Sequence, residues 1–210
     1  MTNTQKLSAL GIAGPITFVL GIIIAGTQYD GYSHISQEIS QLGGVDSQYP
    51  WIQNLNFYLL SLTVIGFTFG LHKAIDGGRG SIIGIVLIAL LGFSAAGLNS
   101  VFPCDSLCEG ITAAGKLHLI TGVGGVLAMA IGLTVVSRRM AKSLEWKTYS
   151  RYTLAAGILG FVLFFAIGVT KGIEDAEVDG LMQRIFISNY LIWLFVTGLR
   201  VVRTPKLTSE

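Results

Sequence analysis

Six long apolar stretches alternate with shorter polar stretches along the 210-residue chain. Each apolar stretch is close to the roughly 20 residues that a helix needs to cross the hydrocarbon core of a bilayer. The pattern therefore predicts an all-α, polytopic membrane protein, with a six-transmembrane-helix bundle that forms a single domain over residues 1–210. The predicted spans cover residues 7–27, 51–72, 81–102, 117–137, 152–170 and 180–202.

The composition agrees with a location in lipid. Hydrophobic residues make up 51% of the chain and charged residues 12%, against about 25% charged residues in soluble domains. The first apolar run, 7–27, is too long for the core of a signal peptide, so we expect it to be a retained helix. A net charge of +2, with the basic residues clustered beside the spans, excludes a nucleic-acid-binding protein.

The charged residues divide unevenly between the two sides that six spans define. The side of the termini holds eleven Lys or Arg and three Asp or Glu, whereas the other side holds three and nine. Short cytoplasmic loops retain Lys and Arg. The distribution therefore predicts a multi-pass protein of the cell membrane with both termini in the cytoplasm and an acidic outer face.

Small residues recur within the spans at positions where helices could approach closely. We expect helix packing at these positions: Gly66, Gly70, Gly80, Gly84, Gly122, Gly124, Gly125 and Ala128.

The first outer connection, 28–50, is long and contains a short amphipathic segment that ends at two glycines. As a helix, the segment would carry an apolar stripe and a polar stripe, because residues three and four apart are neighbours. The stripes are Ile35, Ile39 and Leu42, and His34, Glu38 and Gln41. Such a helix either lies in the membrane interface or folds over the bundle as a lid that turns His34 and Glu38 inward.

Both cysteines of the chain, Cys104 and Cys108, lie in the second outer connection. Disulfides persist on the outer side of a membrane, so we predict a bridge that closes a tight loop around Asp105. A free pair or a thiolate metal site is the alternative.

Several polar residues lie near the outer ends of the spans. His118 and Lys116 open the fourth span, Arg184 opens the sixth, and Asn99 lies one turn before the end of the third. Ionisable groups within a membrane are costly and usually belong to a functional site. For Lys116 and Arg184 the alternative is that the long side chain reaches out to the interface.

Two His and two carboxylates at one level could hold zinc or another divalent metal, which would activate a water molecule for attack on an ester or amide. The metal or acid/base residues would be His34, Glu38, Asp105 and His118. Arg184 would bind an anionic group, with further binding groups in Lys116, Asn99, Ser33 and Ser36. Ser33 or Ser36 could instead be the nucleophile, and a plain polar outer surface explains the same residues without a site.

Short signatures carry a family resemblance over nearly the whole chain: the segment 32–43, Phe102-Pro103-Cys104-Asp105, His118 and Gln183-Arg184. They resemble an uncharacterised prokaryotic family of six-helix membrane proteins, domain of unknown function nine hundred ninety-eight. A more distant similarity is to alkaline ceramidases, which look like metal hydrolases built from three His, an Asp and a Ser. This chain has only two outward His and lacks the paired His of their last helix.

Together these features predict an outward-facing polar pocket that binds a lipid or small amphiphile, with metal-assisted hydrolase or transferase chemistry as an extension. The expected partners are membrane lipids and a small amphiphilic ligand, and a homo-oligomer stays open. One alternative is a small transporter or channel, although the span centres offer mostly Ser, Thr and Gly. Another alternative is a non-catalytic assembly or sensor protein.

Overall fold

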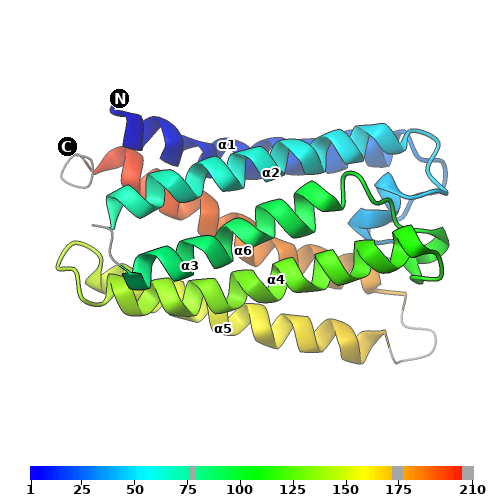
Figure 1. Ribbon diagram of the computed structural model, residues 1–210. Coiled ribbons are helices and arrows are strands. Elements are labelled where there is room, and N and C mark those ends of the chain that lie inside the picture. The colour runs from blue at the N-terminus through cyan, green and yellow to red at the C-terminus, as the bar shows by residue number, and fades with distance from the viewer. Residues whose placement is uncertain (76–78, 172–176, 205–210) are drawn as a thin grey trace.

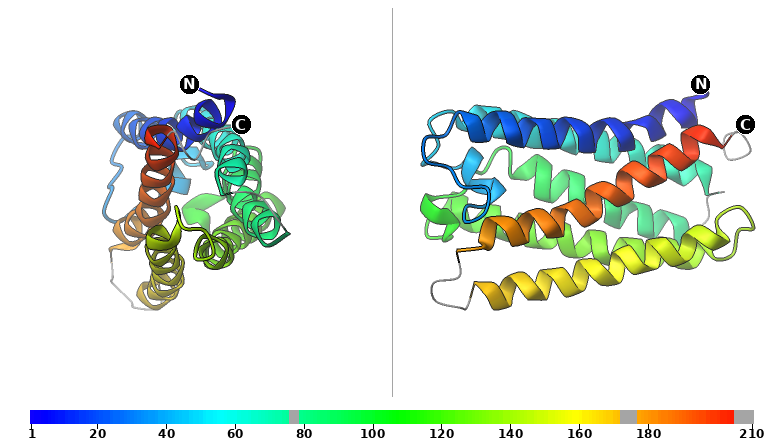
Figure 2. Two further views of the ribbon diagram at one scale, coloured as in Figure 1. Left: turned by 90° about the vertical axis from the view of Figure 1, so that its left-hand side faces the viewer. Right: turned by 180° about the vertical axis from the view of Figure 1, so that it is seen from behind.

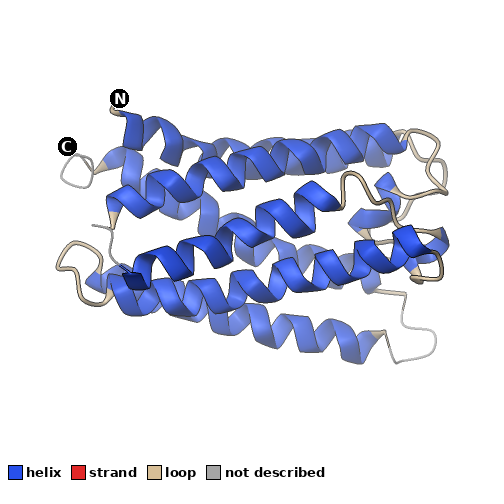
Figure 3. Ribbon diagram, in the orientation of Figure 1, coloured by secondary structure: helices blue, strands red, loops and turns tan. Residues whose placement is uncertain are grey.

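The computed structural model describes the chain except for residues 76–78, 172–176 and 205–210 and the side chains of residues 79–81. Within the described residues, every regular element is a helix (Figure 3), which confirms the predicted all-α class. The main helices are α1 (Asn3–Thr27), α2 (Pro50–Ala74), α3 (Arg79–Leu90), α4 (Ala113–Met140), α5 (Lys147–Thr170) and α6 (Asp179–Arg203). Three short elements join them: η1 (Ile39–Gly43), η2 (Leu91–Leu98), which continues α3, and η3 (Ser106–Cys108).

The helices lie side by side in one bundle, with both chain ends at the same end of it (Figure 1). We call this end the terminal end. The opposite end carries η1, η3 and the loops around them, and we call it the η1 end.

Helices α1 and α4 begin at capping residues that lie outside the apolar runs. Thr2 accepts a hydrogen bond from the backbone N–H of Gln5 and donates its own N–H to the Gln5 side chain. Thr112 caps α4 by accepting the N–H of Gly115. Side-chain caps satisfy backbone groups that a helix end leaves unpaired. For this reason α1 and α4 each start four residues before the predicted spans.

Glycines allow α1, α2 and α6 to pack closely at the terminal end. A Cβ at Gly70 would lie 2.7 Å from the backbone N of Ser8, and a Cβ at Gly198 would lie 2.7 Å from the backbone O of Ser8. Gly125 of α4 meets Ala95 of η2 in the same way. The packing expected at Gly70 and Gly125 is therefore present, whereas Gly124 faces open space.

The third crossing changes from an α-helix to a π-helix at Leu91. In the part of the chain that the structure describes, five helices are long and apolar enough to span a membrane, and this crossing provides a shorter apolar helix over Ile82–Leu98. Gly92 and Gly97 permit close contact between the π segment and Ser61 of α2. Single π turns inside helices often occur at functional sites, and this one ends directly before Asn99.

The second half of α5 is less buried than the first. Its buried residues end at Gly160, and none of residues 161–170 is buried. Up to that point small residues hold α5 against the bundle, and a Cβ at Gly160 would clash with the Tyr190 ring. Beyond it, Phe161, Leu163 and Phe164 are only partly buried where they pack against the core. The second half of α5 consequently lies at the margin of the bundle (Figure 2).

Candidate functional site

A cavity of about 200 Å³ lies in the η1 half of the bundle and is only partly enclosed. Its walls come from α1, α2, η2, α4, α5 and α6, with the segment 38–40 across one end. Val123 lines the cavity and is 42% exposed, which indicates an opening toward the surface of α4. The deeper lining is apolar and includes Phe18, Phe57, Leu60, Leu91, Val126, Phe164, Phe186, Leu191 and Leu194.

Most polar side chains of the cavity gather at the η1 end. They are Glu38, Ser40, Asn99, His118, Lys171 and Gln183. Each lies at or within about one to two turns of the end of its helix, or in the loop that crosses that end. Deeper in the cavity lies one further polar group, the Tyr190 hydroxyl, which donates a hydrogen bond to the carbonyl O of Val126. The cavity therefore has a largely apolar interior and one polar end.

Glu38 is fixed at the polar end by two partners. Gln183 donates from Nε2 to one carboxylate oxygen at 2.9 Å, and Lys171 forms an ion pair with the other. The Oε1 atom of Gln183 also accepts the backbone N–H of Ile39 at 2.6 Å. A single α6 side chain thus orients both Glu38 and the start of η1.

His118 belongs to a buried chain of hydrogen bonds. Its Nδ1 lies 2.8 Å from the carbonyl O of Phe102 and its Nε2 lies 3.3 Å from Nδ2 of Asn99. Because a carbonyl only accepts and an amide N–H only donates, Nδ1 carries the proton and His118 is neutral. Asn99 in turn accepts the hydroxyl of Thr121 at 2.6 Å. The chain joins η2 to α4 at the cavity wall.

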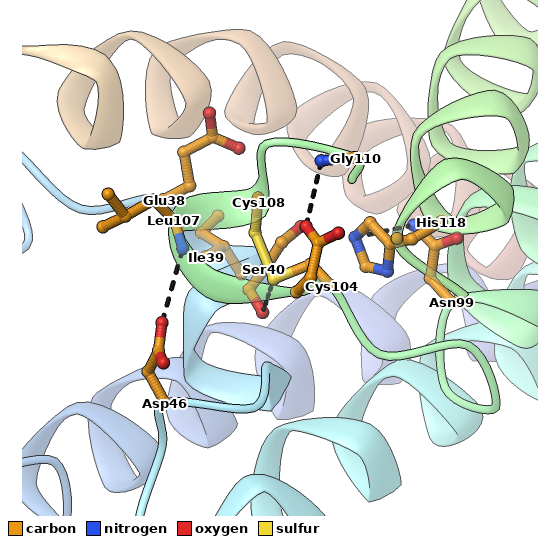
Figure 4. The surroundings of a disulfide bond; sticks show 12 residues. Glu38, Ile39, Ser40, Asp46, Asn99, Cys104, Leu107, Cys108, Gly110 and His118 are labelled. Atoms are coloured by element: carbon orange, nitrogen blue, oxygen red, sulfur yellow. Dashed lines mark hydrogen bonds between the residues drawn. A yellow bond between two sulfur atoms is a disulfide. The ribbon is translucent and has the colours of Figure 1, made fainter. Parts of the chain in front are cut away.

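The Cys104–Cys108 disulfide, predicted from the sequence, closes the loop above the cavity (Figure 4). Cys108 is one of the lining residues. The loop is tied to the first connection by the N–H of Val45, which donates to the O of Cys104 at 3.1 Å, and by the N–H of Leu107, which donates to Asp46 at 3.3 Å. The disulfide loop and the η1 segment therefore form one roof.

Asp105 stabilises this loop from within. Its carboxylate accepts the backbone N–H of Gly110 at 2.9 Å and of Thr112 at 2.7 Å. These hydrogen bonds hold the pKa of Asp105 below its usual value. Both carboxylate oxygens are turned to the backbone, so Asp105 orders the start of α4 and does not line the cavity.

Arg184 and His34 lie outside the cavity, in a neighbouring groove between α1 and α6. Arg184 donates from Nη1 to the carbonyls of Gln37 and Gly180 and from Nη2 to the hydroxyl of Tyr32 and to Nδ1 of His34, at 2.6 to 3.0 Å. Burial and the Arg184 charge lower the pKa of His34. Arg184 thus uses four of its five donors to dock the first connection onto α6.

The two spaces share a wall. Ile39, Ile187 and Leu191 line both the cavity and the groove. This wall separates Glu38, Asn99 and His118, which the structure brings to one cavity, from His34 and Arg184.

The remaining sequence-predicted residues serve the surrounding turns or surface. The Ser33 hydroxyl accepts the backbone N–H of Ile35 and Ser36 and so closes a turn. Ser36 is half-buried in the same turn, and Lys116 lies on an exposed face of α4. Neither lines the cavity.

The expected pairing of His34 and Glu38 on one helix face does not occur. The helix covers only Ile39–Gly43, and Glu38 has an extended backbone with φ −68° and ψ 153°. The bonds from α6 to Gln37, Glu38 and Ile39 compete with helix formation in this segment and direct the two side chains to different partners. Among the described residues, no three His, Cys, Asp or Glu side chains are grouped to hold a metal.

The sequence-predicted site lacked both partners of the Glu38 carboxylate, Lys171 and Gln183. Lys171 ends α5 on the side with few basic residues, and Gln183 precedes Arg184. Their positions in the sequence indicate that they lie near the same end of the bundle as Glu38, but not that they contact it. The ion pair with Glu38 joins residues 133 positions apart, and only the fold brings them together.

A bundle of six helices, five of them long and apolar enough to cross a membrane, defines a polytopic helical membrane protein. Comparison with known families then identifies the chain more closely. It belongs to the protein family of unknown function DUF998, whose profile matches residues 12–200. No curated protein and no solved structure matched the chain. The similarity to alkaline ceramidases is not supported by these comparisons.

Proposed function

We propose that the protein binds a lipid-like amphiphile in the cavity, with its apolar chain in the bundle and its polar head at the η1 end. The observation that carries the proposal is the distribution of the lining: apolar side chains in depth, and Glu38, Lys171, Gln183, Asn99 and His118 at one end. This is the pattern of a ligand site, which is mostly apolar with a few placed polar groups.

The size of the cavity supports an apolar occupant. An apolar cavity of about 150 Å³ stays dry and binds a benzene-sized molecule, and this cavity has about 200 Å³. Its partial opening beside α4 and the second half of α5, which has no buried residue, would admit a molecule from the bilayer.

The proposed orientation places the η1 end outside the cell. The side of the termini carries eleven of the fourteen Lys and Arg residues, as expected for cytoplasmic loops. Cysteine variants at Ser47 and Lys142, in a chain with Cys104→Ser and Cys108→Ser, test it with a membrane-impermeant thiol reagent. Labelling of intact cells at position 47 and not at position 142 is expected, and the reverse pattern would reject the orientation.

Binding can be tested with a single-chain lipid that carries a diazirine near the end of its chain. In liposomes containing the protein, photolysis should attach the probe to the apolar lining, at residues such as Leu91, Val126 and Phe164. Peptide mass spectrometry locates the attachment.

Two glycines on α4 provide a matched pair of variants. Gly122 lines the cavity, and a Cβ there would lie 3.2 Å from Asn99, whereas a Cβ at Gly124 meets nothing within 4 Å. Gly122→Leu should fill the cavity and remove most of the labelling, and Gly124→Leu should leave it unchanged. Equal labelling of wild type and Gly122→Leu would reject the cavity as the binding site.

A further inference from the structure

We infer that the head group recognised at the polar end is zwitterionic, with an ammonium group that binds Glu38 and an anionic phosphate that binds Lys171. This inference rests on the proposed function and names the chemical class of the ligand. The observation behind it is an ion pair between these two side chains at the polar end of an otherwise apolar cavity.

The two members of the pair differ in mobility. The Glu38 side chain is 12% exposed, and its second oxygen is held by Gln183, which is itself bound to the backbone of Ile39. The Lys171 side chain is 44% exposed and ends the half of α5 that has no buried residue. Glu38 is therefore a fixed carboxylate, and Lys171 is a cation at a partly exposed helix end.

The pairing sets the charge that a head group must carry. An anionic head group would draw Lys171 away and leave the Glu38 carboxylate without its counter-ion. A cationic head group would take the place of Lys171 on Glu38 and leave Lys171 without its counter-ion. An uncompensated charge in a partly buried site is costly. A zwitterion replaces both members of the pair at once, because its ammonium group faces Glu38 and its phosphate faces Lys171.

The neighbouring polar groups suit this assignment. His118 is neutral, and its ring nitrogens are directed to Phe102 and Asn99. Gln183 is neutral too, and Arg184 lies behind the shared wall, in the groove. Glu38 and Lys171 are thus the charged side chains among the lining residues of the described cavity.

Three photoactivatable probes with the same diazirine chain test the inference. Their head groups are phosphoethanolamine, a phosphate monoester and a primary ammonium group. In liposomes of neutral lipid, the phosphoethanolamine probe should label the cavity lining of the wild type several-fold more than either singly charged probe.

Single variants should redirect the preference. Lys171→Met leaves Glu38 unpaired and should favour the ammonium probe, whereas Glu38→Gln leaves Lys171 unpaired and should favour the phosphate probe. Lys116→Met and Glu109→Gln are matched controls, since both residues are exposed at the same end and neither lines the cavity. Both controls should keep the wild-type preference.

The outcomes separate the two proposals. If all three probes label the cavity equally, or if Lys171→Met and Glu38→Gln both keep the wild-type preference, the head-group inference fails and the binding function stands. If no probe labels the cavity lining, the binding function itself fails. Lys171→Met changes an exposed helix end, so it keeps the test decisive even where Glu38→Gln folds poorly.

Discussion

Arg184 donates a hydrogen bond from Nη2 to Nδ1 of His34 at 3.0 Å. The bond requires an unprotonated Nδ1, so the docked form of the first connection contains neutral His34. Burial and the adjacent guanidinium lower the pKa of His34 below 6.5.

Acid should therefore loosen this connection. Because the pKa is lower in the docked form than in a freely exposed His, the stabilisation is complete above about pH 6.5 and is lost as the pH falls through the docked-state pKa. Hydrogen exchange of residues 29–44, corrected for intrinsic rates, should be several-fold faster at pH 5 than at pH 7.5. His34→Gln, which keeps an acceptor for Arg184, should remove this dependence, and His72→Gln at the other end of the bundle should retain it. An unchanged pH response in His34→Gln would contradict the assignment.

The chain His118–Asn99–Thr121 predicts coupled effects on stability. Hydrogen bonds between membrane helices contribute about 0.6 kcal/mol on average and up to about 1.7 kcal/mol. Asn99→Leu and Thr121→Val should each lower the free energy of unfolding by about this amount. The double variant should cost less than the two losses combined, since both variants break one chain. Unfolding in detergent measures all three, and strictly additive losses would show that the two bonds act independently.

Close approach of α6 to α1 makes Gly198 sensitive to substitution. Gly198→Ala would place a Cβ 2.7 Å from the backbone O of Ser8, and overpacking of this kind costs about 1 to 3 kcal/mol. Gly168→Ala is the control, because nothing lies within 4 Å of a Cβ there and Ala favours the helix by up to about 1 kcal/mol. Thermal unfolding should show a lower midpoint for Gly198→Ala alone; equal midpoints would contradict the close packing.

Reduction of the Cys104–Cys108 bridge should weaken the roof of the cavity. For a loop this short, the entropic contribution of a disulfide is about 2 kcal/mol. A reductant should lower the unfolding midpoint of the wild type and speed hydrogen exchange at Val45 and Leu107, which bond across the two loops. The double variant Cys104→Ser/Cys108→Ser should not respond to the reductant. A wild type that is equally indifferent would show that the bridge adds no stability.

The sequence was most informative where one local signal decides the structure. Apolar runs predicted the six helices, and the two cysteines, four residues apart on the acidic side, predicted the bridge. Gly70 and Gly125 were expected at helix contacts and lie there.

The site depended on contacts between distant segments, which local patterns do not contain. Periodicity placed His34 and Glu38 on one helix face, but bonds from α6 hold Glu38 in an extended conformation. The sequence favoured Arg184 as an anion-binding group, but four of its N–H groups donate hydrogen bonds to other residues of the same chain. The π segment before Asn99 likewise has no signature in a uniformly apolar run.

The second half of α5 affects the concentration scale on which the affinity for an amphiphile should be expressed. Residues 161–170 contain no buried side chain and border the cavity through Phe164 and Ile167. An occupant that passes beside this half would come from the surrounding lipid and not from water. Occupancy would then follow the mole fraction of the amphiphile in the membrane, and diluting the sample with buffer would leave it unchanged.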